Sequence, residues 1–435
     1  MKANQSHLTK LGRLAGCLLL VVVLAASLLT VTAFADGEIA ETVTPAQGSP
    51  VKNSTPANLV ATGSGVTVVS ASSWEEQYPE IYASYMRNSE NTEVVDYVEA
   101  YPMIATLFAN YGFAHSYGSA RGHAYVIDDV TGTGRPHAMA NCFTCKTPDF
   151  TAKVVEMGDA AYSIPFEDML QEVNEPLGCY NCHANTGKDL VVTHTYLTKA
   201  LGDDMAKIDA KDLACGQCHV DYYFAPETKV TTLPYDSLEA MHPDKILDYY
   251  NNLMVDGQVF ADYVNPNGVR QIMVNHPEFE TFTAEGSVHR NTFTCADCHM
   301  GKATAADGST YSNHYLSSPL ENEELIASTC SLCHGSAAPE LHELVHSIQE
   351  KAEARTYEIG YKLEELLNAI TEAVDSGSYS EEQLDAIRMS YRNAQFYWNF
   401  VFVENSEGAH NSKLTYECLD KSEALIAETW TLLGK

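Results

Sequence analysis

The sequence predicts a mostly α-helical protein in which a loop-rich body precedes long C-terminal helices. Apolar residues recur at helical spacing along the last hundred residues, and short helical stretches alternate with long loops from about residue 74 to residue 334. Ten of the twelve cysteines form five C-x-x-C pairs, all within the loop-rich body. We therefore expect that body to be ordered partly by groups bound at these pairs rather than by its own side chains alone.

The composition limits the possible partners. The 435 residues carry a formal net charge of −32, and a chain this acidic repels phosphate backbones, which excludes nucleic acid as a partner. Hydrophobic residues make up 45% of the chain, so a packed core is expected and global disorder is excluded.

The N-terminus has the features of an export segment. Lys2, Lys10 and Arg13 precede an apolar run over residues 14–34, and small residues at 33 and 35 offer a cleavage site. The run is long enough to span a bilayer uncleaved. Residues 1–35 are thus interpreted as a signal peptide or an N-terminal anchor, and both alternatives stay open. Residues 36–73, rich in Ser, Thr, Val, Ala, Gly and Pro, predict a flexible linker.

The remainder is expected to form one domain, with a body over 74–334 and a long-helix region over 335–435. Within the body, residues 126–130 are one of the few strand-like runs. In the long-helix region, Gly377 fits a helix stop, and Ser380 with Gln383 fits a capping box at the start of the next helix. The long apolar stripe of the first of these helices predicts either an intramolecular bundle or, as we favour, a dimer interface.

The cysteine pairs and the residue after each pair indicate the chemistry. In chain order they read C-F-T-C-K (142–146), C-Y-N-C-H (179–183), C-G-Q-C-H (215–219), C-A-D-C-H (295–299) and C-S-L-C-H (330–334). C-x-x-C-H is the attachment motif of c-type haem, in which the histidine becomes an axial iron ligand. Histidine is 16 of 435 residues, so four such histidines by chance have a probability on the order of one in 10⁵.

Two other interpretations of the cysteine pairs are less consistent with the sequence. Disulfides do not require a following histidine, and zinc ribbons need two closely spaced pairs, whereas these pairs lie 32 or more residues apart. The first motif ends in Lys146, whose amine ligates iron only when deprotonated. This difference predicts four electron-carrying haems and one haem that binds substrate, or else a degenerate motif without a special role.

The chain resembles the pentahaem ammonia-forming cytochrome c nitrite reductases, which have one C-x-x-C-K haem followed by four C-x-x-C-H haems. The segments Arg121-Gly122-His123, V-D-Y-Y-F (220–224) and His276-Pro277-Glu278 also resemble family motifs in order and spacing. The resemblance runs from about residue 74 to beyond His410. It implies a mostly α multihaem cytochrome c, with a loop-rich five-haem body followed by long C-terminal helices.

The resemblance implies a full set of ligands for five covalent haem c groups. The cofactor-binding residues are Cys142, Cys145, Lys146, Cys179, Cys182, His183, Cys215, Cys218, His219, Cys295, Cys298, His299, Cys330, Cys333 and His334, with distal ligands His314 for the second haem, His123 for the third, His410 for the fourth and His289 for the fifth. The Lys146 haem then keeps an open distal face. The implied catalytic residues are Arg135, Tyr222 and His276, with Arg121 as a fallback for Arg135 because the loop after Arg135 is shorter than in the family.

The resemblance also implies a calcium ion near the active haem. Its ligands would be Asp221, Tyr222, the carbonyl group of Met273 and the side chain of Asn275. Asp221 and Asn275 are each one methylene shorter than the family's Glu and Gln, and calcium–oxygen distances are about 2.3–2.6 Å, so the reach of both side chains matters. Alternatively, these two residues simply hydrogen-bond each other or water.

The implied function is the six-electron reduction of nitrite to ammonium at the lysine-ligated haem, fed by four bis-histidine haems. A multihaem electron-transfer cytochrome, or a reductase of hydroxylamine or sulfite, stays open as an alternative. The family further implies a membrane-bound quinol-oxidising multihaem cytochrome as electron donor and a homodimer. Together with the N-terminal segment, this predicts an exported protein in the periplasm or on the outer face of the cytoplasmic membrane.

Overall fold

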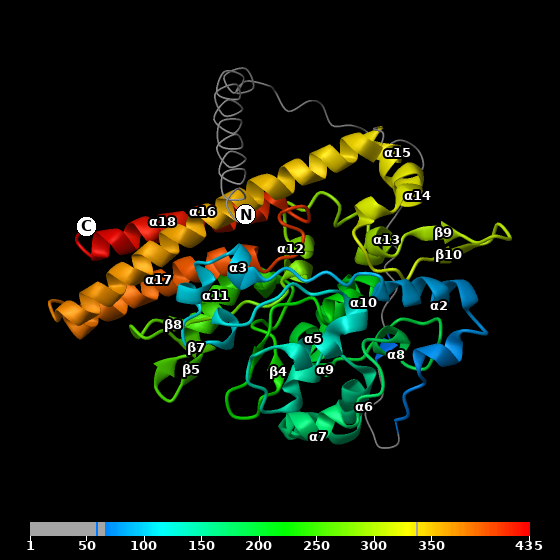
Figure 1. Cartoon of the computed structure of the whole chain (residues 1–435), viewed down its shortest axis with the longest axis horizontal. Helices are drawn as coiled ribbons and strands as arrows, with labels where there is room; N and C mark the ends of the chain where they lie inside the picture. Colours follow the sequence, from blue (N-terminus) through cyan, green and yellow to red (C-terminus); the bar gives the residue numbers. More distant parts are fainter. Residues whose placement is uncertain (1–57, 60–65, 336–337) are drawn as a thin grey trace, which may run out of the picture. The chain divides into compact units, whose positions relative to one another are not determined.

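The computed structural model describes residues 58–59, 66–335 and 338–435 (Figure 1). The predicted signal or anchor segment 1–35 and most of the predicted linker 36–73 lie outside the described residues. The described end of that linker touches the body, since the Val69 N–H donates to Asn185 Oδ1 at 3.1 Å and the Ala71 N–H donates to Glu175 Oε2 at 3.0 Å. No helix within the described residues is long and apolar enough to cross a membrane.

Helices dominate the described residues, which confirms the predicted mostly α fold class. The α-helices are α2 (Pro79–Met86), α3 (Tyr97–Ala100), α4 (Ile104–Leu107), α5 (Val126–Gly132), α6 (Pro148–Met157), α7 (Phe166–Leu170), α8 (Cys179–His183), α9 (Thr195–Leu201), α10 (Ala210–Gly216), α11 (Pro243–Asn252), α12 (Glu278–Thr283), α13 (Cys295–His299), α14 (Glu323–Leu325), α15 (Ser331–His334), α16 (Ala338–Ser376), α17 (Glu381–Phe402) and α18 (Ser412–Leu432). Up to α15 the helices are short and separated by loops, as predicted for the body.

Single turns and short hairpins make up most of the remaining regular structure. The 3₁₀ turns are η2 (Ala71–Trp74), η3 (Arg87–Ser89), η4 (Gly112–Ala114), η5 (His123–Tyr125), η6 (Ala140–Phe143), η7 (Gly158–Ser163), η8 (Gly202–Lys207), η9 (Glu239–Met241) and η10 (Pro319–Glu321), and a π-helical turn, η11, spans Ile326–Cys330. The strands are β1 (Asn58–Leu59), β2 (Val191–Val192), β3 (Tyr223–Phe224), β4 (Thr231–Thr232), β5 (Met254–Val255), β6 (Gln258–Val259), β7 (Tyr263–Val264), β8 (Arg270–Gln271), β9 (Lys302–Thr304) and β10 (Thr310–Ser312). They form five two-stranded sheets: β1–β2 is parallel, and β3–β4, β5–β6, β7–β8 and β9–β10 are antiparallel.

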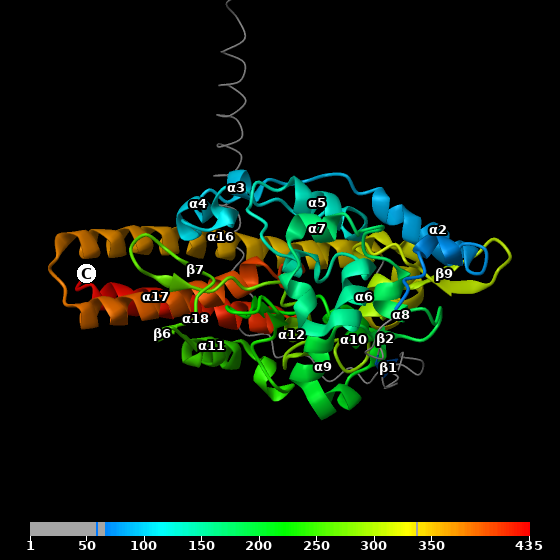
Figure 2. The ribbon, with the colours of Figure 1, turned by 90° about the horizontal axis from the view of Figure 1, so that it is seen from below.

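The three long helices α16, α17 and α18 run side by side, as Figures 1 and 2 both show. The predicted capping box is confirmed: Ser380 Oγ accepts the Gln383 N–H at 3.3 Å, and the Ser380 N–H donates to Gln383 Oε1 at 2.9 Å. Gly377 ends α16 with φ +63°, a left-handed conformation that glycine adopts without steric cost. Gly377 and the capping box at Ser380 thus fix where the chain turns between α16 and α17.

The apolar stripe of α16 is buried inside the chain. Ile359, Leu363 and Leu366 are each 0% exposed and belong to the large core shared with α17, α18 and α4. The intramolecular bundle therefore accounts for this part of the stripe. Leu344, near the start of α16, remains 49% exposed, and the predicted dimer interface stays a prediction.

The strand predicted for residues 126–130 is wrong, because these residues begin helix α5. Asp128 and Asp129 stand in its first turn, where negative charge interacts favourably with the helix dipole. The Thr131 hydroxyl donates to the Ile127 carbonyl at 2.8 Å and so satisfies a group near the helix end. Local β propensity of Val and Ile is weaker than these terminal interactions and the packing of Val130, which is buried.

We predict that Leu366→Ala lowers the free energy of unfolding by about 2–5 kcal/mol, because it leaves a cavity in the bundle core. Leu344→Ala, on the same helix but exposed, should change it by less than about 0.5 kcal/mol. Urea denaturation followed by far-ultraviolet circular dichroism measures both. An equal loss in the two variants would contradict the view that only the Leu366 face is covered.

Candidate functional site

Each of the five C-x-x-C motifs lies on a helical turn. Helices α8 and α13 coincide with the second and fourth motifs, while the third begins at Cys215 in α10 and the fifth at Cys330 in η11. On a helical turn, residues three and four apart share a face. The two cysteine thiols of each motif and the residue that follows them therefore point to the same side, which is the arrangement needed to hold one flat ligand.

Motifs that are far apart in the chain also lie close together in space. The thiols of Cys145 and Cys218, in the first and third motifs, lie within 4.8 Å of each other and of a His194 ring nitrogen. Cys215 interacts directly with Cys295 of the fourth motif. The Cys182 thiol of the second motif lies 4.0 Å from the Ala214 carbonyl oxygen, beside the third. Groups bound at the first four motifs would thus be neighbours.

The Cys145, Cys218 and His194 side chains form a set that could instead bind zinc. The sequence analysis missed His194, whose position beside two motifs far apart in the chain gave no local signal. Each of the two cysteines, however, has its own C-x-x-C partner three residues away. Metal binding by this set would leave Cys142 and Cys215 without a role.

The structure brings together the two histidines of each predicted axial pair. The ring centroids are 6.3 Å apart for His183 and His314, 6.2 Å for His123 and His219, 6.1 Å for His299 and His410, and 6.2 Å for His289 and His334. Two imidazole nitrogens bound at about 2.0 Å on opposite sides of one metal ion place the ring centroids about 6 Å apart. The spacing of all four pairs fits an iron atom between the rings.

His219 has a second ring at the same spacing, since its centroid lies 6.1 Å from that of His276. The spacing alone therefore does not choose its partner. Burial and the charge of His219 together lower the pKa of His123 to about 4, so its ring is neutral, as an iron ligand requires. Its Nδ1 atom has no hydrogen-bond partner within the described residues.

Several of these histidines are oriented through Nδ1. His183 Nδ1 donates to the Asp189 carbonyl at 3.2 Å, His299 Nδ1 to the Ser317 carbonyl at 3.1 Å, and His314 Nδ1 to the Ser312 carbonyl at 2.9 Å. A carbonyl oxygen only accepts, so in the neutral ring Nδ1 carries the proton and Nε2 is left with a free lone pair. This is the tautomer that a metal-ligating histidine needs.

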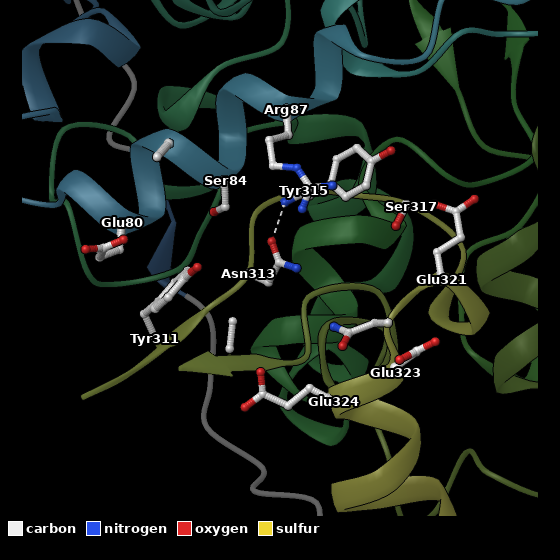
Figure 3. Close-up of a pocket in the computed structure, with 13 residues that line it drawn as sticks. Glu80, Ser84, Arg87, Tyr311, Asn313, Tyr315, Ser317, Glu321, Glu323 and Glu324 are labelled. Atoms are coloured by element: carbon white, nitrogen blue, oxygen red, sulfur yellow. Dashed lines mark hydrogen bonds between the residues drawn. The ribbon is translucent and has the colours of Figure 1, made fainter. Parts of the chain in front are cut away.

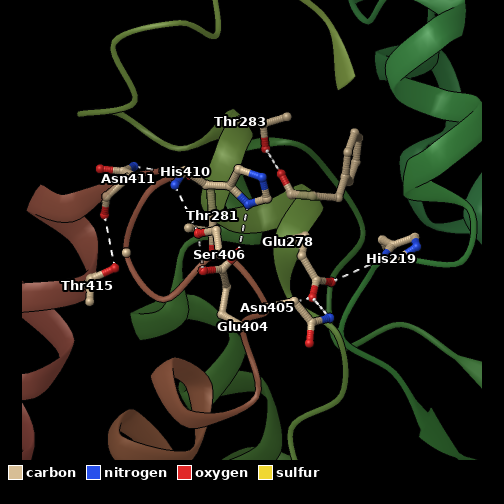
Figure 4. A network of polar contacts seen from close by, with 12 residues as sticks. His219, Glu278, Thr281, Thr283, Glu404, Asn405, Ser406, His410, Asn411 and Thr415 are labelled. Atoms are coloured by element: carbon tan, nitrogen blue, oxygen red, sulfur yellow. Dashed lines mark hydrogen bonds and ion pairs between the residues drawn. The ribbon is translucent and has the colours of Figure 1, made fainter. Parts of the chain in front are cut away.

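Two histidines bond to carboxylates rather than to carbonyl groups. His410 Nδ1 lies 2.7 Å from Glu404 Oε1, and His219 Nδ1 lies 3.4 Å from Glu278 Oε2 (Figure 4). Although burial opposes it, the Glu278 charge raises the pKa of His219 to about 9. The sequence analysis missed both glutamates as partners, because each is recognisable only once the loops are folded.

Exposed apolar side chains beside the fifth motif also fit a large apolar ligand. Val288, next to His289, is 83% exposed, and Leu332, between the two cysteines of the motif, is 53% exposed. Large exposed aliphatic side chains usually mark a surface that something covers. A porphyrin held between His289 and His334 would lie against them, so the residues present fit a haem here.

Around the first motif, Arg135 provides positive charge. Its guanidinium lies 4.0 Å from the Phe113 ring centroid, and within the described residues it has no carboxylate partner. Burial lowers its pKa, but arginine remains protonated in proteins, and the hydroxyls of Tyr117 and Tyr111 act in the opposite direction. A Cβ at Gly112 would lie 2.8 Å from Arg135 Cγ, so the absence of a side chain there makes room for Arg135.

Arg121, the fallback for Arg135, is engaged elsewhere. It donates to Asp129 Oδ1 through Nε at 2.8 Å and through a second nitrogen at 2.5 Å, and it lies over the Tyr125 ring. The Asp129 carboxylate balances its charge. The structure therefore leaves Arg135, rather than Arg121, with an uncompensated charge near the first motif.

Tyr222 and His276 complete the surroundings of the first motif. Burial, together with the nearby thiols of Cys145 and Cys142, raises the pKa of Tyr222 well above its usual range, so the hydroxyl keeps its proton. Burial lowers the pKa of His276; the charge of Glu278 opposes this, while the charges of His219 and Lys146 act in the same direction as burial. The electrostatic influence of Lys146 and these thiols shows that the predicted catalytic residues gather at one place.

The backbone holds His276 in an unusual conformation. Its φ is +46°, which is rare for a residue with a side chain. Just before it, the Val274 N–H donates to Asn399 Oδ1 of α17 at 2.9 Å. Such strain persists where neighbouring contacts impose it, and it typically marks a functional site.

The predicted calcium ligands also meet at one place. Asn275 Nδ2 donates to the Tyr222 carbonyl at 3.2 Å and to the Met273 carbonyl at 3.0 Å, and the Asn275 N–H donates to Asp221 Oδ1 at 2.9 Å. The two carbonyl oxygens thus converge on the amide group. With the amide turned over, three oxygens would face one another and would need a cation between them.

Two further acidic residues, missed in the sequence, lie beside Asp221. Glu280 Oε1 accepts from the Asp221 N–H at 2.9 Å, while Glu280 Oε2 is buried with no partner within the described residues. Asp262 Oδ2 accepts the Met273 N–H at 2.9 Å. Burial raises the pKa of Asp221 and Glu280, and raises that of Asp262 to about 7. This oxygen-rich and incompletely bonded group fits a divalent cation, whose charge would favour the ionised forms of the three carboxyl groups.

A polar pocket of about 560 Å³ lies between α2 and the β9–β10 hairpin (Figure 3). Arg87 stacks on Tyr315 at its edge, 4.2 Å from the ring centroid. Four glutamates line it: Glu80, Glu321, Glu323 and Glu324. Negative charge of this density repels anions, so the pocket is not a site for an anionic substrate.

Comparison with known proteins agrees with this geometry. The cytochrome c552 family model matches residues 70–434. The catalytic subunit of cytochrome c nitrite reductase from Desulfovibrio desulfuricans, a structure described with two calcium sites, is similar with a TM-score of 0.75 and 27% identity, over 86% of this chain and 87% of that chain.

Two larger cytochromes are more distantly similar. The outer cell wall cytochrome OcwA has a TM-score of 0.39 and 18% identity, over 70% of this chain and 48% of that one. An undecahaem cytochrome from the S-layer of Carboxydothermus ferrireducens has a TM-score of 0.36 and 17% identity, over 72% and 41%.

The family match covers most of the length of the sequence. It confirms the resemblance to the pentahaem ammonia-forming cytochrome c nitrite reductases that the motifs carry, and with it the expectation of an oxidoreductase. The chain belongs to the cytochrome c552 family.

Proposed function

We propose that this protein reduces nitrite to ammonium at a c-type haem attached to the first motif and ligated by Lys146. The observation that carries the proposal is the gathering of Arg135, Tyr222 and His276 around the one motif that ends in lysine. Each of the other four motifs has a histidine with a second imidazole at the spacing of an iron ligand pair.

Four bis-histidine haems follow from those pairs as part of the same proposal. Their ligands are His183 with His314, His219 with His123, His299 with His410, and His334 with His289. Both axial positions are then filled by protein, which suits electron transfer and excludes substrate. Electrons would reach the first motif through neighbouring motifs without a diffusing carrier.

Substrate binding depends on a positively charged side chain of this protein, that of Arg135. When bound, the Lys146 haem supplies an open iron site and the electrons for the reduction. Arg135 offers fixed guanidinium donors to the nitrite oxygens in a protein that is otherwise strongly acidic. The Arg135 guanidinium has no carboxylate partner within the described residues. Its whole positive charge is therefore available to attract an anion.

Proton delivery is the proposed task of His276, assisted by Tyr222. N–O cleavage needs a proton donor beside each departing oxygen. His276 lies beside Lys146, where its ring can pass protons to the bound anion. Tyr222 keeps its hydroxyl proton and orients the bound anion by hydrogen bonding, with the Tyr222 carbonyl belonging to the calcium group.

The calcium ion belongs to the proposal at Asp221, Asn275 and the carbonyl groups of Tyr222 and Met273. The unpartnered Glu280 Oε2 and the buried carboxylates support it. Bound there, the ion would orient the Tyr222 backbone and add positive charge on the side of the incoming anion. The shortened side chains of Asp221 and Asn275 would leave some ligand positions to water.

Two other functions remain to be distinguished by experiment. An electron-transfer cytochrome gains nothing from an unpaired arginine beside a lysine-ligated haem, which favours the enzyme. Hydroxylamine or sulfite reduction would use the same residues. The proposal also includes a homodimer, a membrane-bound quinol-oxidising multihaem cytochrome as electron donor, and export to the periplasm or the outer face of the cytoplasmic membrane.

The mature protein should carry five covalent haems. Intact-mass spectrometry after denaturation counts them, since thioether bonds survive unfolding. Cys418 is a buried residue of helix α18 and lies outside the motifs, so Cys418→Ser should keep all five haems. Cys330→Ser should weaken attachment at the fifth motif alone. Four or fewer haems on the unaltered chain would refute the proposed cofactor set.

His276→Ala should slow ammonium formation by about 10²–10⁴-fold, because it removes a positioned proton donor. The measurement is an anaerobic assay with a reduced viologen and nitrite, scoring ammonium, with haem content checked in parallel. His346→Ala, an exposed histidine on α16, is the matched control and should behave like the unaltered protein. If the unaltered protein makes no ammonium, nitrite reduction is wrong; if only His276→Ala is unaffected, His276 has no part in it.

Chelation should lower nitrite reduction without loss of haem, and added calcium should restore it. Asp221→Glu adds the missing methylene, so stripping this variant should require about tenfold stronger chelation. Asp168→Glu, exposed on α7, is the control and should strip like the unaltered protein. Metal analysis that finds fully active protein without calcium would end the calcium proposal and leave Asp221 and Asn275 as hydrogen-bonding residues.

A further inference from the structure

The predicted axial histidines differ in what holds their Nδ1 atoms. His183 and His314, the pair at the second motif, both bond to backbone carbonyl oxygens, as does His299 at the fourth. His410, paired with His299, instead bonds to a carboxylate, that of Glu404. The two pairs thus offer an internal comparison between neutral and charged acceptors.

Glu404 is held firmly in place. It lies in the segment between α17 and α18 and is 4% exposed. Its Oε1 lies 2.7 Å from His410 Nδ1, and its Oε2 accepts the Ser406 hydroxyl at 2.6 Å (Figure 4). Ser406 Oγ in turn accepts the His410 N–H at 2.9 Å, so the carboxylate and the ring are oriented by the same residue.

Asn405, the residue after Glu404, acts on a second histidine, His219, through another carboxylate. The Asn405 N–H and side-chain amide donate to Glu278 Oε1 at 3.2 and 2.5 Å. Glu278 Oε2 lies 3.4 Å from His219 Nδ1. This contact is longer than the one to His410, and the carboxylate shares its charge with Asn405. Its influence on His219 is therefore expected to be weaker than that of Glu404 on His410.

We infer that Glu404 is a positioning residue that lowers the reduction potential of the iron held by His299 and His410. The inference rests on the proposed function, because it takes these two histidines as axial ligands. A buried carboxylate draws the Nδ1 proton towards itself and makes the ring a stronger electron donor. Electron donation stabilises ferric over ferrous iron. The two carbonyl acceptors at the second motif exert no comparable pull.

The position of the His299 and His410 pair among the motifs determines how a lowered reduction potential would affect electron transfer. Cys295 of the fourth motif contacts Cys215 of the third, while Cys298 lies near Cys330 of the fifth. Glu404 thus makes it less favourable for an electron to reside on the haem of the fourth motif, which lies between the third and fifth motifs. An electron held at the third motif is retained there, next to Cys145 of the first motif, where nitrite would be reduced.

Glu404→Gln tests the inference, because glutamine keeps the shape and the acceptor oxygen but removes the charge. Redox titration of the full-length holoprotein, followed by electron paramagnetic resonance, reports the midpoint of each low-spin signal. Glu407→Gln is the matched control: it lies in the same segment, is exposed and also loses one carboxylate.

In Glu404→Gln we expect one low-spin signal to move to higher potential by at least a tenfold change in its equilibrium, ~59 mV for one electron. Its g-values should change, and the haem count should not. The control should leave that signal in place. An unmoved midpoint, or an equal shift in Glu407→Gln, would overturn the inference while leaving the proposed function intact. If His410→Ala retains every low-spin signal, the proposed ligation itself fails, and this inference with it.

Discussion

The proposed ligation, in which eight imidazoles each present Nε2 to an iron, accounts for much of the loop-rich body. Several of these rings are held through Nδ1 by acceptors in the neighbouring loops: the Ser312 carbonyl holds His314, the Ser317 carbonyl holds His299, and Glu404 holds His410. The helical turns of the C-x-x-C motifs supply one ring of each pair. The bundle of α16, α17 and α18 has its own apolar core and supplies a rigid support for the remainder.

Charge distribution provides the second constraint. The chain carries a net charge of −32, yet the residues around the first motif include Arg135 without a carboxylate partner. Its acidic residues are placed elsewhere, four of them around the polar pocket beside α2. The buried group of Asp221, Glu280 and Asp262 lies close to the site, as does Glu278, which bonds to His219. A bound cation would turn this group from a repulsive neighbour of the substrate into a neutral support.

The sequence predicted what depends on local pattern. The C-x-x-C turns, the glycine stop at 377 and the Ser380 capping box all require residues within five positions of one another, and the structure has them. The strand predicted at 126–130 is wrong because acidic residues and tertiary packing favoured a helix. Glu404, Glu278, Glu280 and His194 were missed since their partners are set by loop packing. A glutamate two residues before a serine has no distinguishing pattern until His410 lies beside it.

The central claim is that four haems are closed by histidine pairs and one is open at Lys146. Low-temperature electron paramagnetic resonance of the oxidised protein, with spin quantitation before and after addition of nitrite, tests it most directly. The account predicts four low-spin ferric haems and one whose spectrum changes when nitrite binds, while the other four stay unchanged. A spectrum in which nitrite alters none of the haems, or in which fewer than four are low-spin, would contradict it.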